Sequence, residues 1–577
     1  MIVKEQDVER ICKEIEQSDY VSLDFETVSL QDKRPVAFTF AYGDKVYFVP
    51  IKMKYFINLP FKAYLKLIIT LAKHENLIFH HAAFDLQVLD KMGVSCRTSP
   101  HDTLILSHLV DENGSHKLKD LSKQYLDYNM LKYKDVCGVG KKQIPFSHVK
   151  DKEVAEKYAS DDAAVTLQLF NLLYEKVAKD ENLAQAYNEV ERPLLLVVND
   201  MHLHGVPING EKIDQICTKC DKFKEHYKGK LDCYMADVNL NSPKQLREYF
   251  IGKKKMPILK RSRKTNEPSV DSEVLQKYAS KHNSMEADWI LKYRYYSKIL
   301  TTFVPALTPD ESGKIHPHFH QVGTTSGRFS SSEPNFQNIP AKDEFGIRDA
   351  IEAPEGYTFV GADYSQMELR FAAYESGDKA MIETFNKGKD IHSETAKKVG
   401  CDRGQAKCIN FGILYGVGVR TLSKMMGSTA QEAQEYIHNY HSSYKTLYLW
   451  TREVRQRALE QGYLQLFLGR QRHIPPNFED KTDWQKGGIL RSMVNSVIQG
   501  GCASAMKKAM VLMHEDLKKF NATVIATIHD EVIVLCKEEN ADEVKKIVEK
   551  DMLKPIENLG VKFEVDVNVG RTWSEVH

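Results

Sequence analysis

The stretch YTFVGADYSQMELR (357–370) decides the second half of the chain, because its pattern changes partway along. The first residues are the aromatic and β-branched types of a buried strand, and a helical pattern begins at MELR. Asp363 is therefore expected where the strand ends, exposed at a sheet edge. A second stretch, TVIATIHDEVIVLC (523–536), contains two β-rich runs joined at His529 and Asp530, so a hairpin places Asp530 at its tip. Two aspartates on separate turns suit two magnesium ions, although turn aspartates without a metal are common.

The segment between these two stretches predicts a helix with one functional face. In RGQAKCINFGILYG (403–416), a stripe repeats every four residues through Arg403, Lys407, Phe411 and Tyr415. Two cations one turn apart suit a triphosphate, because phosphate oxygens take charge-assisted hydrogen bonds from both. An aromatic ring further along can stack on a base. The alternative is an amphipathic surface helix with a half-buried aromatic edge.

A second group of acids lies in the first 190 residues. The segment VSLDFE alternates apolar and polar residues, so Asp24 and Glu26 share one face of a strand. A divalent cation or a solvated outer face would each relieve their repulsion. Asp85 follows a short strand, and Tyr158 and Asp162 lie four apart on one helix face. Two-metal hydrolysis of a phosphodiester needs about four such carboxylates from distant segments.

The remaining pattern predicts alternating strands and helices, then a largely helical region, then a mixed one. A boundary is expected near 185–195, where Pro193 interrupts a long helical region. The expected elements are an antiparallel meander over 21–50, a helix over 61–75, a strand over 77–80, a helix from Phe84, a loop over 130–150, a helix over 154–177, mainly helices over 195–310 with a break at 252–270, and mixed structure from 321.

Composition limits the class of protein without naming it. The chain has 577 residues, of which 42% are hydrophobic, and this length suggests three or four domains. Lysine plus arginine is 80 and aspartate plus glutamate is 79, so the net charge of +1 shows no basic footprint for nucleic acid. Ten cysteines without a disulfide pattern indicate reduced thiols. No signal peptide or apolar run of about 18 residues is present, so a soluble intracellular protein is expected.

The motifs together resemble a known family. DYSQMELR, RGQAKCINFGILYG and IHDE resemble motifs A, B and C of family A DNA polymerases, and SGRFSSSEPNFQNIP and RSMVNSVIQG resemble two further stretches of that family, all in family order. DFET, the segment ending in FD, and YxxxD resemble the three motifs of a ribonuclease-H-like (DEDD) 3′-5′ proofreading exonuclease, as in members of the bacterial DNA polymerase I or Klenow type. The resemblance spans nearly the whole chain, from about residue 20 to the end.

The resemblance implies an α/β and α+β multidomain fold. A ribonuclease-H-like exonuclease domain is expected first, followed by a right-hand polymerase with palm, fingers and thumb. The expected boundaries are 1–190 for the exonuclease and 191–577 for the polymerase, with the thumb about 191–320, the palm about 321–373 and 489–577, and the fingers about 374–488.

The resemblance also implies the site residues. The ligands for two Mg²⁺ ions per centre, with Mn²⁺ able to substitute, are Asp363, Tyr364 (by its carbonyl) and Asp530 in the polymerase, and Asp24, Glu26, Asp85 and Asp162 in the exonuclease. Glu531, Lys407 and Tyr158 join Asp363 and Asp530 as catalytic residues. The nucleotide is expected to meet Gln366, Glu368 (a steric gate against a ribose 2′-hydroxyl), His392, Arg403, Lys407, Phe411 and Tyr415. Primer–template DNA is expected to meet Arg328, Asn335, Gln337, Asn338, Arg491, Asn495, Gln499 and His529.

Some positions depart from the family pattern. The second exonuclease motif has His81 and Ala83 where an asparagine and a lysine are expected, which bears on substrate positioning and rate. Lys342 stands where an arginine is common, and keeps the charge but loses the bidentate fork. The basic run 253–264 fits the tip of a thumb that follows duplex phosphates, with a solvated loop as the alternative. No metal ligand is lost.

The implied activity is template-directed DNA synthesis with 3′-5′ proofreading, in replication or repair. The expected partners are primer–template DNA and deoxynucleotides, for a monomer in the cytoplasm of a bacterial or phage-infected cell, with no 5′-nuclease domain. The sequence names no helicase, primase or processivity factor. The alternatives are a single-subunit RNA polymerase, a non-catalytic DNA-binding subunit, and a dedicated exonuclease whose second half only holds DNA.

Overall fold

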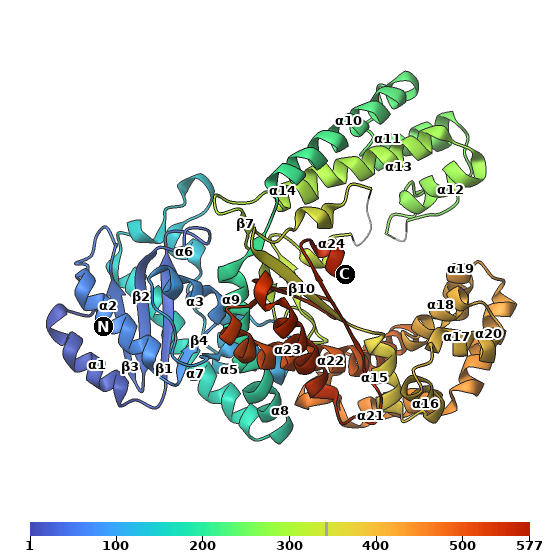
Figure 1. The fold of residues 1–577 in the computed structure, drawn as a ribbon. Helices are drawn as coiled ribbons and strands as arrows, with labels where there is room; N and C mark the ends of the chain where they lie inside the picture. The colour runs from blue at the N-terminus through green and yellow to red at the C-terminus, as the bar shows by residue number, and fades with distance from the viewer. Residues whose placement is uncertain (263, 341–343) are drawn as a thin grey trace.

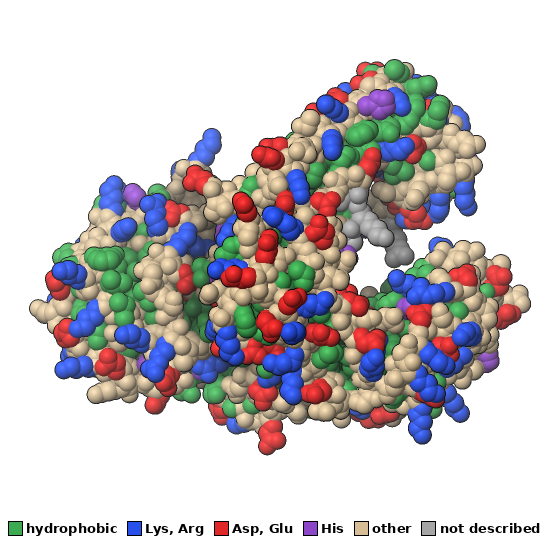
Figure 2. Space-filling model, in the orientation of Figure 1, with side chains coloured by type: hydrophobic (Ala, Val, Ile, Leu, Met, Phe, Trp, Pro, Cys, Tyr) green, Lys and Arg blue, Asp and Glu red, His purple; other side chains and the backbone are tan. Residues whose placement is uncertain are grey.

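The structure is a computed structural model that describes residues 1–262, 264–340 and 344–577. Arg263 of the basic run and Lys342 therefore lie outside the described residues. The N-terminal part of the chain forms one body beside a hand-shaped second body (Figure 1). In the second body, an arm of helices stands on one side and a group of shorter helices on the other, and the surface is hollowed between them (Figure 2).

The N-terminal body is built on one mixed sheet. The strand order is β3 (Lys45–Pro50), β2 (Pro35–Tyr42), β1 (Val21–Thr27), β4 (Leu77–Phe79) and β5 (His101–Asp102). The first three strands pair antiparallel, which confirms the predicted meander, and β4 and β5 continue parallel to β1. The long helix α7 (Lys152–Ala178) packs across the sheet, because it contacts β1, β2, β3 and β4.

The other helices of this body surround the sheet. They are α1 (Val8–Glu16), α2 (Phe61–Lys73), α3 (Ala82–Lys91), α4 (Thr103–Val110), α5 (Leu118–Leu126), α6 (Tyr133–Cys137) and α8 (Glu181–Ala186). The prediction of a loop over 130–150 is wrong in part, because this stretch contains α6 and two 3₁₀ turns. The helix is too short to show a period, and burial of Cys137 and Phe146 holds the stretch in place.

The junction between the two bodies is helical throughout. A π-helical turn over Tyr187–Glu191 runs directly into α9 (Arg192–His204). The prediction that Pro193 interrupts the helix is therefore wrong. Pro193 occupies the first turn of α9, where a missing N–H costs nothing. The domain boundary near this point stays a prediction.

In the part of the arm that the structure describes, the α-helices surround a small core of their own. They are α10 (Gly210–Met235), α11 (Pro243–Arg247), α12 (Ser272–His282) and α13 (Met285–Lys298). The basic run lies between α11 and α12, and acids neutralise part of it. Lys254 pairs with Glu286 at 2.6 Å, and Lys260 pairs with Asp271 and Glu273 at 2.8 and 2.7 Å.

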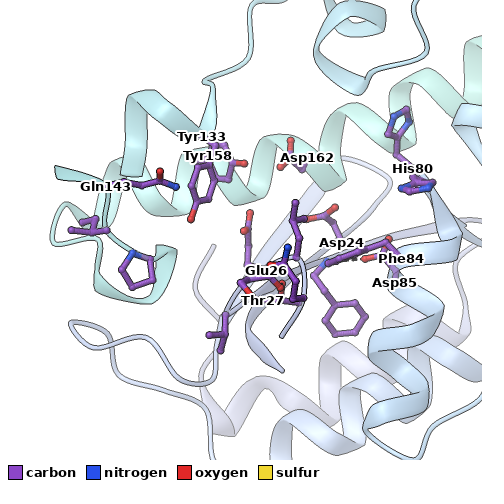
Figure 3. Close-up of a pocket in the computed structure, with 18 of the residues that line it drawn as sticks. Asp24, Glu26, Thr27, His80, Phe84, Asp85, Tyr133, Gln143, Tyr158 and Asp162 are labelled. Atoms are coloured by element: carbon purple, nitrogen blue, oxygen red, sulfur yellow. Dashed lines mark hydrogen bonds between the residues drawn. The ribbon is translucent and has the colours of Figure 1, made fainter. Parts of the chain in front are cut away.

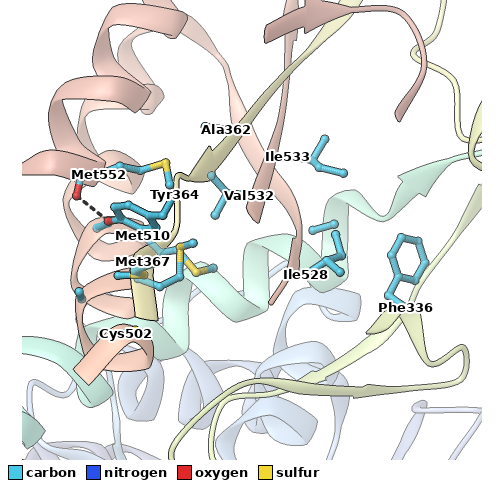
Figure 4. Close-up of a cluster of buried hydrophobic side chains, with 14 of the residues drawn as sticks. Phe336, Ala362, Tyr364, Met367, Cys502, Met510, Ile528, Val532, Ile533 and Met552 are labelled. Atoms are coloured by element: carbon cyan, nitrogen blue, oxygen red, sulfur yellow. Dashed lines mark hydrogen bonds between the residues drawn. The ribbon is translucent and has the colours of Figure 1, made fainter. Parts of the chain in front are cut away.

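The centre of the hand is an antiparallel sheet packed on helices. The strand order is β13 (Thr523–Ile528), β14 (Glu531–Lys537), β10 (Tyr357–Tyr364) and β15 (Val565–Gly570). The sheet packs on α22 (Asp483–Leu517) and α23 (Ala541–Leu553), and Figure 4 shows the apolar side chains between them. The Tyr364 hydroxyl donates to the Met552 carbonyl at 2.5 Å.

The strand that carries Asp363 confirms one prediction and corrects another. β10 passes into α15 (Met367–Ser376), as the change of pattern predicts. Asp363 is exposed at the end of this strand, as predicted, but β10 is an inner strand, flanked by β14 and β15, so the residue does not lie at a sheet edge. The backbone N–H and C=O groups of a buried strand need partners along both of its edges, and β14 and β15 supply them.

The opposite side of the hand is a helical group with a hairpin at its base. Its elements are α16 (Lys379–Asn386), α17 (Ile391–Val399), α18 (Arg403–Leu414), α19 (Val419–Met426), α20 (Ala430–Ser443), α21 (Lys445–Gln461), β11 (Tyr463–Gln465) and β12 (Gln471–His473). Among the residues placed by the structure, no helix has both the length and the apolar character needed to cross a membrane.

Buried ion pairs join the two bodies. Glu191 accepts from Arg470 at 2.9 Å and from Lys507 at 2.7 Å, and all three side chains are almost fully buried. Glu112 binds Arg472, and one of its oxygens lies 2.9 Å from Nδ1 of His473. Because Arg470 and β12 belong to the hairpin at the base of the helical group, this hairpin holds the N-terminal body against the hand.

Candidate active sites

The predicted carboxylates of the N-terminal body meet in one cavity. Asp24 and Glu26 lie on β1 beneath α7, which carries Asp162, and one oxygen of each of these three residues lies within 4.8 Å of the others. Asp85, in the first turn of α3, accepts the N–H of Phe25 at 3.2 Å. All four acids line a cavity of about 1020 Å³, together with Tyr158 (Figure 3).

The electrostatics of this cavity require a positive partner. Burial and repulsion from neighbouring acids raise the pKa values of Asp24, Glu26 and Asp85 well above the usual range for a carboxyl group. Burial also raises the pKa of Asp162 to about 7. Oδ1 of Asp162 is buried and has no hydrogen-bond partner within the described chain. Converging buried carboxylates cost free energy unless a counter-charge joins them. The donor set is the all-oxygen set that hard divalent cations prefer, so these residues fit a divalent metal.

A lysine that sequence reasoning missed stands behind this cavity. Lys119, at the start of α5, donates from Nζ to the Leu131 carbonyl at 2.6 Å and lies 4.5 Å from the ring centroid of Tyr158. Its charge lowers the pKa of Asp24, Glu26 and Asp162, against the effect of burial. A single lysine in the segment LKDL gives no local signal, because only the folded contact with α7 brings it near the acids.

The two departures in the second exonuclease motif have different surroundings. His81 precedes α3 with φ of 71°, and its N–H donates to Oδ1 of Asp102 at 3.0 Å. Its ring lines the carboxylate cavity. Ala83 lines a neighbouring cavity, which it shares with Lys33. A cation from another part of the chain is therefore found beside the position where the family pattern has a lysine.

The two aspartates of the hand share a second cavity. β13 and β14 form the predicted hairpin, with His529 (φ 55°) and Asp530 as its two-residue turn. Asp363 lies opposite Glu531 in the register of β10 and β14, and the N–H of Tyr364 donates to the Asp530 carbonyl at 3.3 Å. Asp363, Asp530 and Glu531 all line a cavity of about 360 Å³. The structure therefore places both aspartates in a common cleft.

This cavity also concentrates negative charge. Burial and the charge of Asp530 raise the pKa of Asp363 to about 7, and burial raises the pKa of Asp530 to about 6 and that of Glu531 to about 7. Glu531 is held from below, because Trp573 donates to its Oε1 at 3.0 Å and Nδ1 of His577 lies 3.1 Å from its Oε2. Three neighbouring carboxylates of raised pKa fit a divalent cation for the same reason as in the first cavity.

Glu368 binds both Arg328 and Tyr415. Glu368 and Tyr415 are expected to contact the nucleotide, and Arg328 is expected to contact DNA. Arg328 lies 2.5 Å from Oε1 of Glu368 and 3.6 Å from Oδ1 of Asp530. The Tyr415 hydroxyl donates to the other oxygen of Glu368. Arg328, which sequence reasoning assigned to DNA, thus contacts a predicted metal ligand, a long-range contact that no local pattern shows.

The predicted stripe on α18 is only partly at the cavity. Phe411 and Tyr415 line it and stack with their ring centroids 6.3 Å apart, and Gln366 lines it from the turn before α15. The three predicted phosphate-binding residues do not line it. Arg403 pairs with Asp390 at 2.9 Å, Nδ1 of His392 lies 2.9 Å from the Asn410 amide, and Lys407 is exposed.

The predicted DNA-binding residues lie on three segments: 328–338, α22, and the β13–β14 turn that carries His529. Gln337 donates to the Thr527 carbonyl at 3.0 Å and accepts the N–H of His529 at 3.0 Å, so it braces the β13–β14 turn. The remaining members are exposed Asn335 and Asn338, and half-buried Arg491, Asn495 and Gln499 along α22. Oδ1 of Asn495 is buried without a partner in the part of the chain that the structure describes.

Comparisons with known proteins give the same division. The fold and the two acidic cavities define a chain with an exonuclease-type body joined to a polymerase-type hand. The family model for a 3′-5′ exonuclease matches residues 1–178, and the model for DNA polymerase family A matches residues 211–575. This chain belongs to DNA polymerase family A, as its motifs predict, and carries a 3′-5′ exonuclease domain.

Relatives and a solved structure support this assignment. The DNA polymerase I of Pseudomonas aeruginosa is 30% identical over 98% of this chain, and that of Borreliella burgdorferi is 30% identical over 99%. The chain spans 64% of the length of each. The POL domain of Pol1 from M. smegmatis, solved in complex with DNA primer-template and dNTP, superposes with a TM-score of 0.87 at 23% identity, covering 100% of this chain and 99% of that one. This likeness confirms the predicted fold class.

Proposed function

We propose that this chain is a template-directed DNA polymerase with a 3′-5′ proofreading exonuclease. The observation that carries the proposal is the pair of separate acidic cavities, one under α7 and one at the ends of β10 and the β13–β14 turn. The proposed partners are primer–template DNA and deoxynucleotides, which are the ligands named for the mycobacterial structure. A role in replication or repair, a monomeric state and a cytoplasmic location stay predictions.

In the polymerase centre, we assign divalent ions, specifically two Mg²⁺, to Asp363, Asp530 and the carbonyl of Tyr364. When bound, such ions lower the pKa of an attacking hydroxyl and neutralise charge on a leaving pyrophosphate. Phe411 offers a ring to the sugar and base of the nucleotide, and Glu368 occupies the space that a ribose 2′-hydroxyl would need. When DNA binds, the Arg328 side chain would leave Glu368 and contact the DNA instead.

The three residues near α18 that are predicted to bind phosphates need a movement to act. His392, Arg403 and Lys407 do not line the cavity, whereas Phe411 of the same helix does. We infer that the helical group approaches the sheet when a triphosphate binds, so that these side chains meet its phosphates. Tyr415 must then leave Glu368, because its hydroxyl and the incoming nucleotide compete for the same cavity.

In the exonuclease centre, we assign the divalent ions to Asp24, Glu26, Asp85 and Asp162. Tyr158 lines the same cavity and Lys119 lies against its ring, which supports the proposal that its hydroxyl orients an attacking water. The domain limits of 1–190 and 191–577 are part of the proposal.

Separate substitutions in the two cavities test the proposal. Asp363→Ala should abolish primer extension with Mg²⁺ and deoxynucleotides and leave 3′-end degradation intact. Asp24→Ala combined with Glu26→Ala should do the reverse. If either variant silences both activities on one primer–template, the two-site proposal fails. A preference of the unsubstituted chain for ribonucleotides would instead indicate an RNA polymerase.

A further inference from the structure

A second cavity opens beside the exonuclease carboxylates. It has a volume of about 340 Å³ and shares Leu30, Gln31, His81 and Phe84 with the carboxylate cavity. Its opposite wall comes from the hand, through α9, β8 (His318–His320) and β9 (Ser330–Ser332). The two cavities are therefore adjacent, and the second also borders Ser332 and Glu333 of the segment 326–340 that is proposed to meet DNA.

A buried lysine lines this second cavity without an acidic partner. Lys33 is 8% exposed, and its Nζ donates to the amide oxygen of Gln87 and lies 5.6 Å from the ring centroid of Phe84. Within the described chain, Lys33 forms no ion pair with a carboxylate. A buried cation costs free energy unless an anion joins it, so this position calls for an anion that the chain itself does not supply.

The rest of the lining favours the same kind of ligand. His202, His318 and His320 line the cavity with Lys33. Burial, followed by the neighbouring charges, lowers the pKa of His202 to about 3 and also lowers the pKa of His318 and His320, so the rings are neutral hydrogen-bonding groups and Lys33 is the cation. Glu333 is the one acid among the described lining residues. Its side chain is 81% exposed and lies 3.8 Å from His318, so it neutralises little of the charge. Ammonium and imidazole N–H groups are strong donors to phosphate oxygens.

We propose that Lys33 and His318 form a subsite for a backbone phosphate of the single strand whose 3′ end lies at the carboxylates. The proposal rests on the proposed exonuclease function and adds to it a contact upstream of the scissile bond. A strand is favoured over a free nucleotide, because the subsite borders the carboxylate cavity and its other wall belongs to the hand. Only a strand long enough to leave the first cavity reaches it.

The dependence on strand length tests the subsite. Lys33→Met removes the charge and keeps a similar volume, and Lys91→Met is the matched control, because Lys91 is exposed at the end of α3 and lines neither cavity. Degradation with Mg²⁺ is measured on a dinucleotide and on a single strand of about ten nucleotides. For Lys33→Met, the KM of the longer strand should rise about tenfold, the size of one charge-assisted contact, and that of the dinucleotide less than about twofold. Lys91→Met should match the unsubstituted chain.

Salt dependence gives a readout that a purely structural role would not change. On the longer strand, Lys33→Met should reduce the slope of log affinity against log salt by about 0.7, the value for one phosphate of a single strand. An equal loss on both substrates, or an unchanged slope, overturns the subsite. If the unsubstituted chain degrades neither substrate, the proposed exonuclease itself is refuted, and the subsite with it.

Discussion

Removal of the charge of Glu191 should destabilise the junction between the two bodies. The side chains of Glu191, Arg470 and Lys507 are 3, 3 and 1% exposed, and Glu191 accepts from both cations at less than 3 Å. Glu191→Gln keeps the shape but leaves two buried cations facing a neutral group. Loss of one partner of a buried ion pair costs about 3 to 5 kcal/mol, so a decrease of that size in the free energy of unfolding is expected.

Urea unfolding, followed by tryptophan fluorescence and circular dichroism, measures this cost. Glu189→Gln is the matched control, because Glu189 is 50% exposed and pairs with Lys508 at 3.2 Å, so its loss should cost less than about 1 kcal/mol. Combining Glu191→Gln with Lys507→Met removes the orphaned ammonium and should recover about 2 kcal/mol. A cost below about 1 kcal/mol for Glu191→Gln, or a double variant no more stable than the single one, would refute the reasoning.

Three further outcomes are expected. Burial raises the pKa of Glu375 from 4.5 to about 7, so its protonated form favours the folded state, and the wild type should lose about 3 kcal/mol relative to Glu375→Gln as pH rises from about 4.5 through 7; a difference in unfolding free energy that is the same at pH 5 and pH 8 would contradict this. Lys119→Met should slow single-turnover exonuclease cleavage up to about tenfold by releasing the ring of Tyr158, with Lys119→Arg closer to wild type and extension unaffected. Glu368→Ala should increase ribonucleotide incorporation relative to deoxynucleotides by about tenfold or more in single-nucleotide extension, and an unchanged ratio would exclude Glu368 as the gate.

Local sequence pattern predicts the parts of both sites that lie on single elements. The alternation in VSLDFE places Asp24 and Glu26 on one face of β1, and the β-rich runs around His529 predict the hairpin that carries Asp530. These predictions hold because a strand face and a two-residue turn depend on neighbouring residues. The inner position of β10 is missed, because the strand that flanks it, β15, comes from the end of the chain.

Contacts between distant segments escape such reasoning. Lys119 and Lys33 belong to no motif. Each comes close to a candidate site only because it packs against an element far away in the chain, Lys119 against α7 and Lys33 against α3. The short helix α6 shows the same limit for local structure, because five residues are too few to reveal a helical period. Motifs therefore identify the acids, whereas the cations that support them emerge only from the fold.

The buried junction constrains how the two centres cooperate. Glu112 with Arg472 fixes the N-terminal body directly against the hand, and Glu191 with Arg470 and Lys507 fixes the end of the junction turn that leads out of that body. Breaking such buried contacts costs several kcal/mol. If the protein changed activity by swinging one body away from the other, it would have to break all of these ion pairs at once. Under the proposed function, movement of a DNA strand between the two acidic cavities would break none of these contacts. The strand would then cross a fixed interval, and the proposed subsite at Lys33, which borders the first cavity and the hand, would hold it where it leaves that cavity.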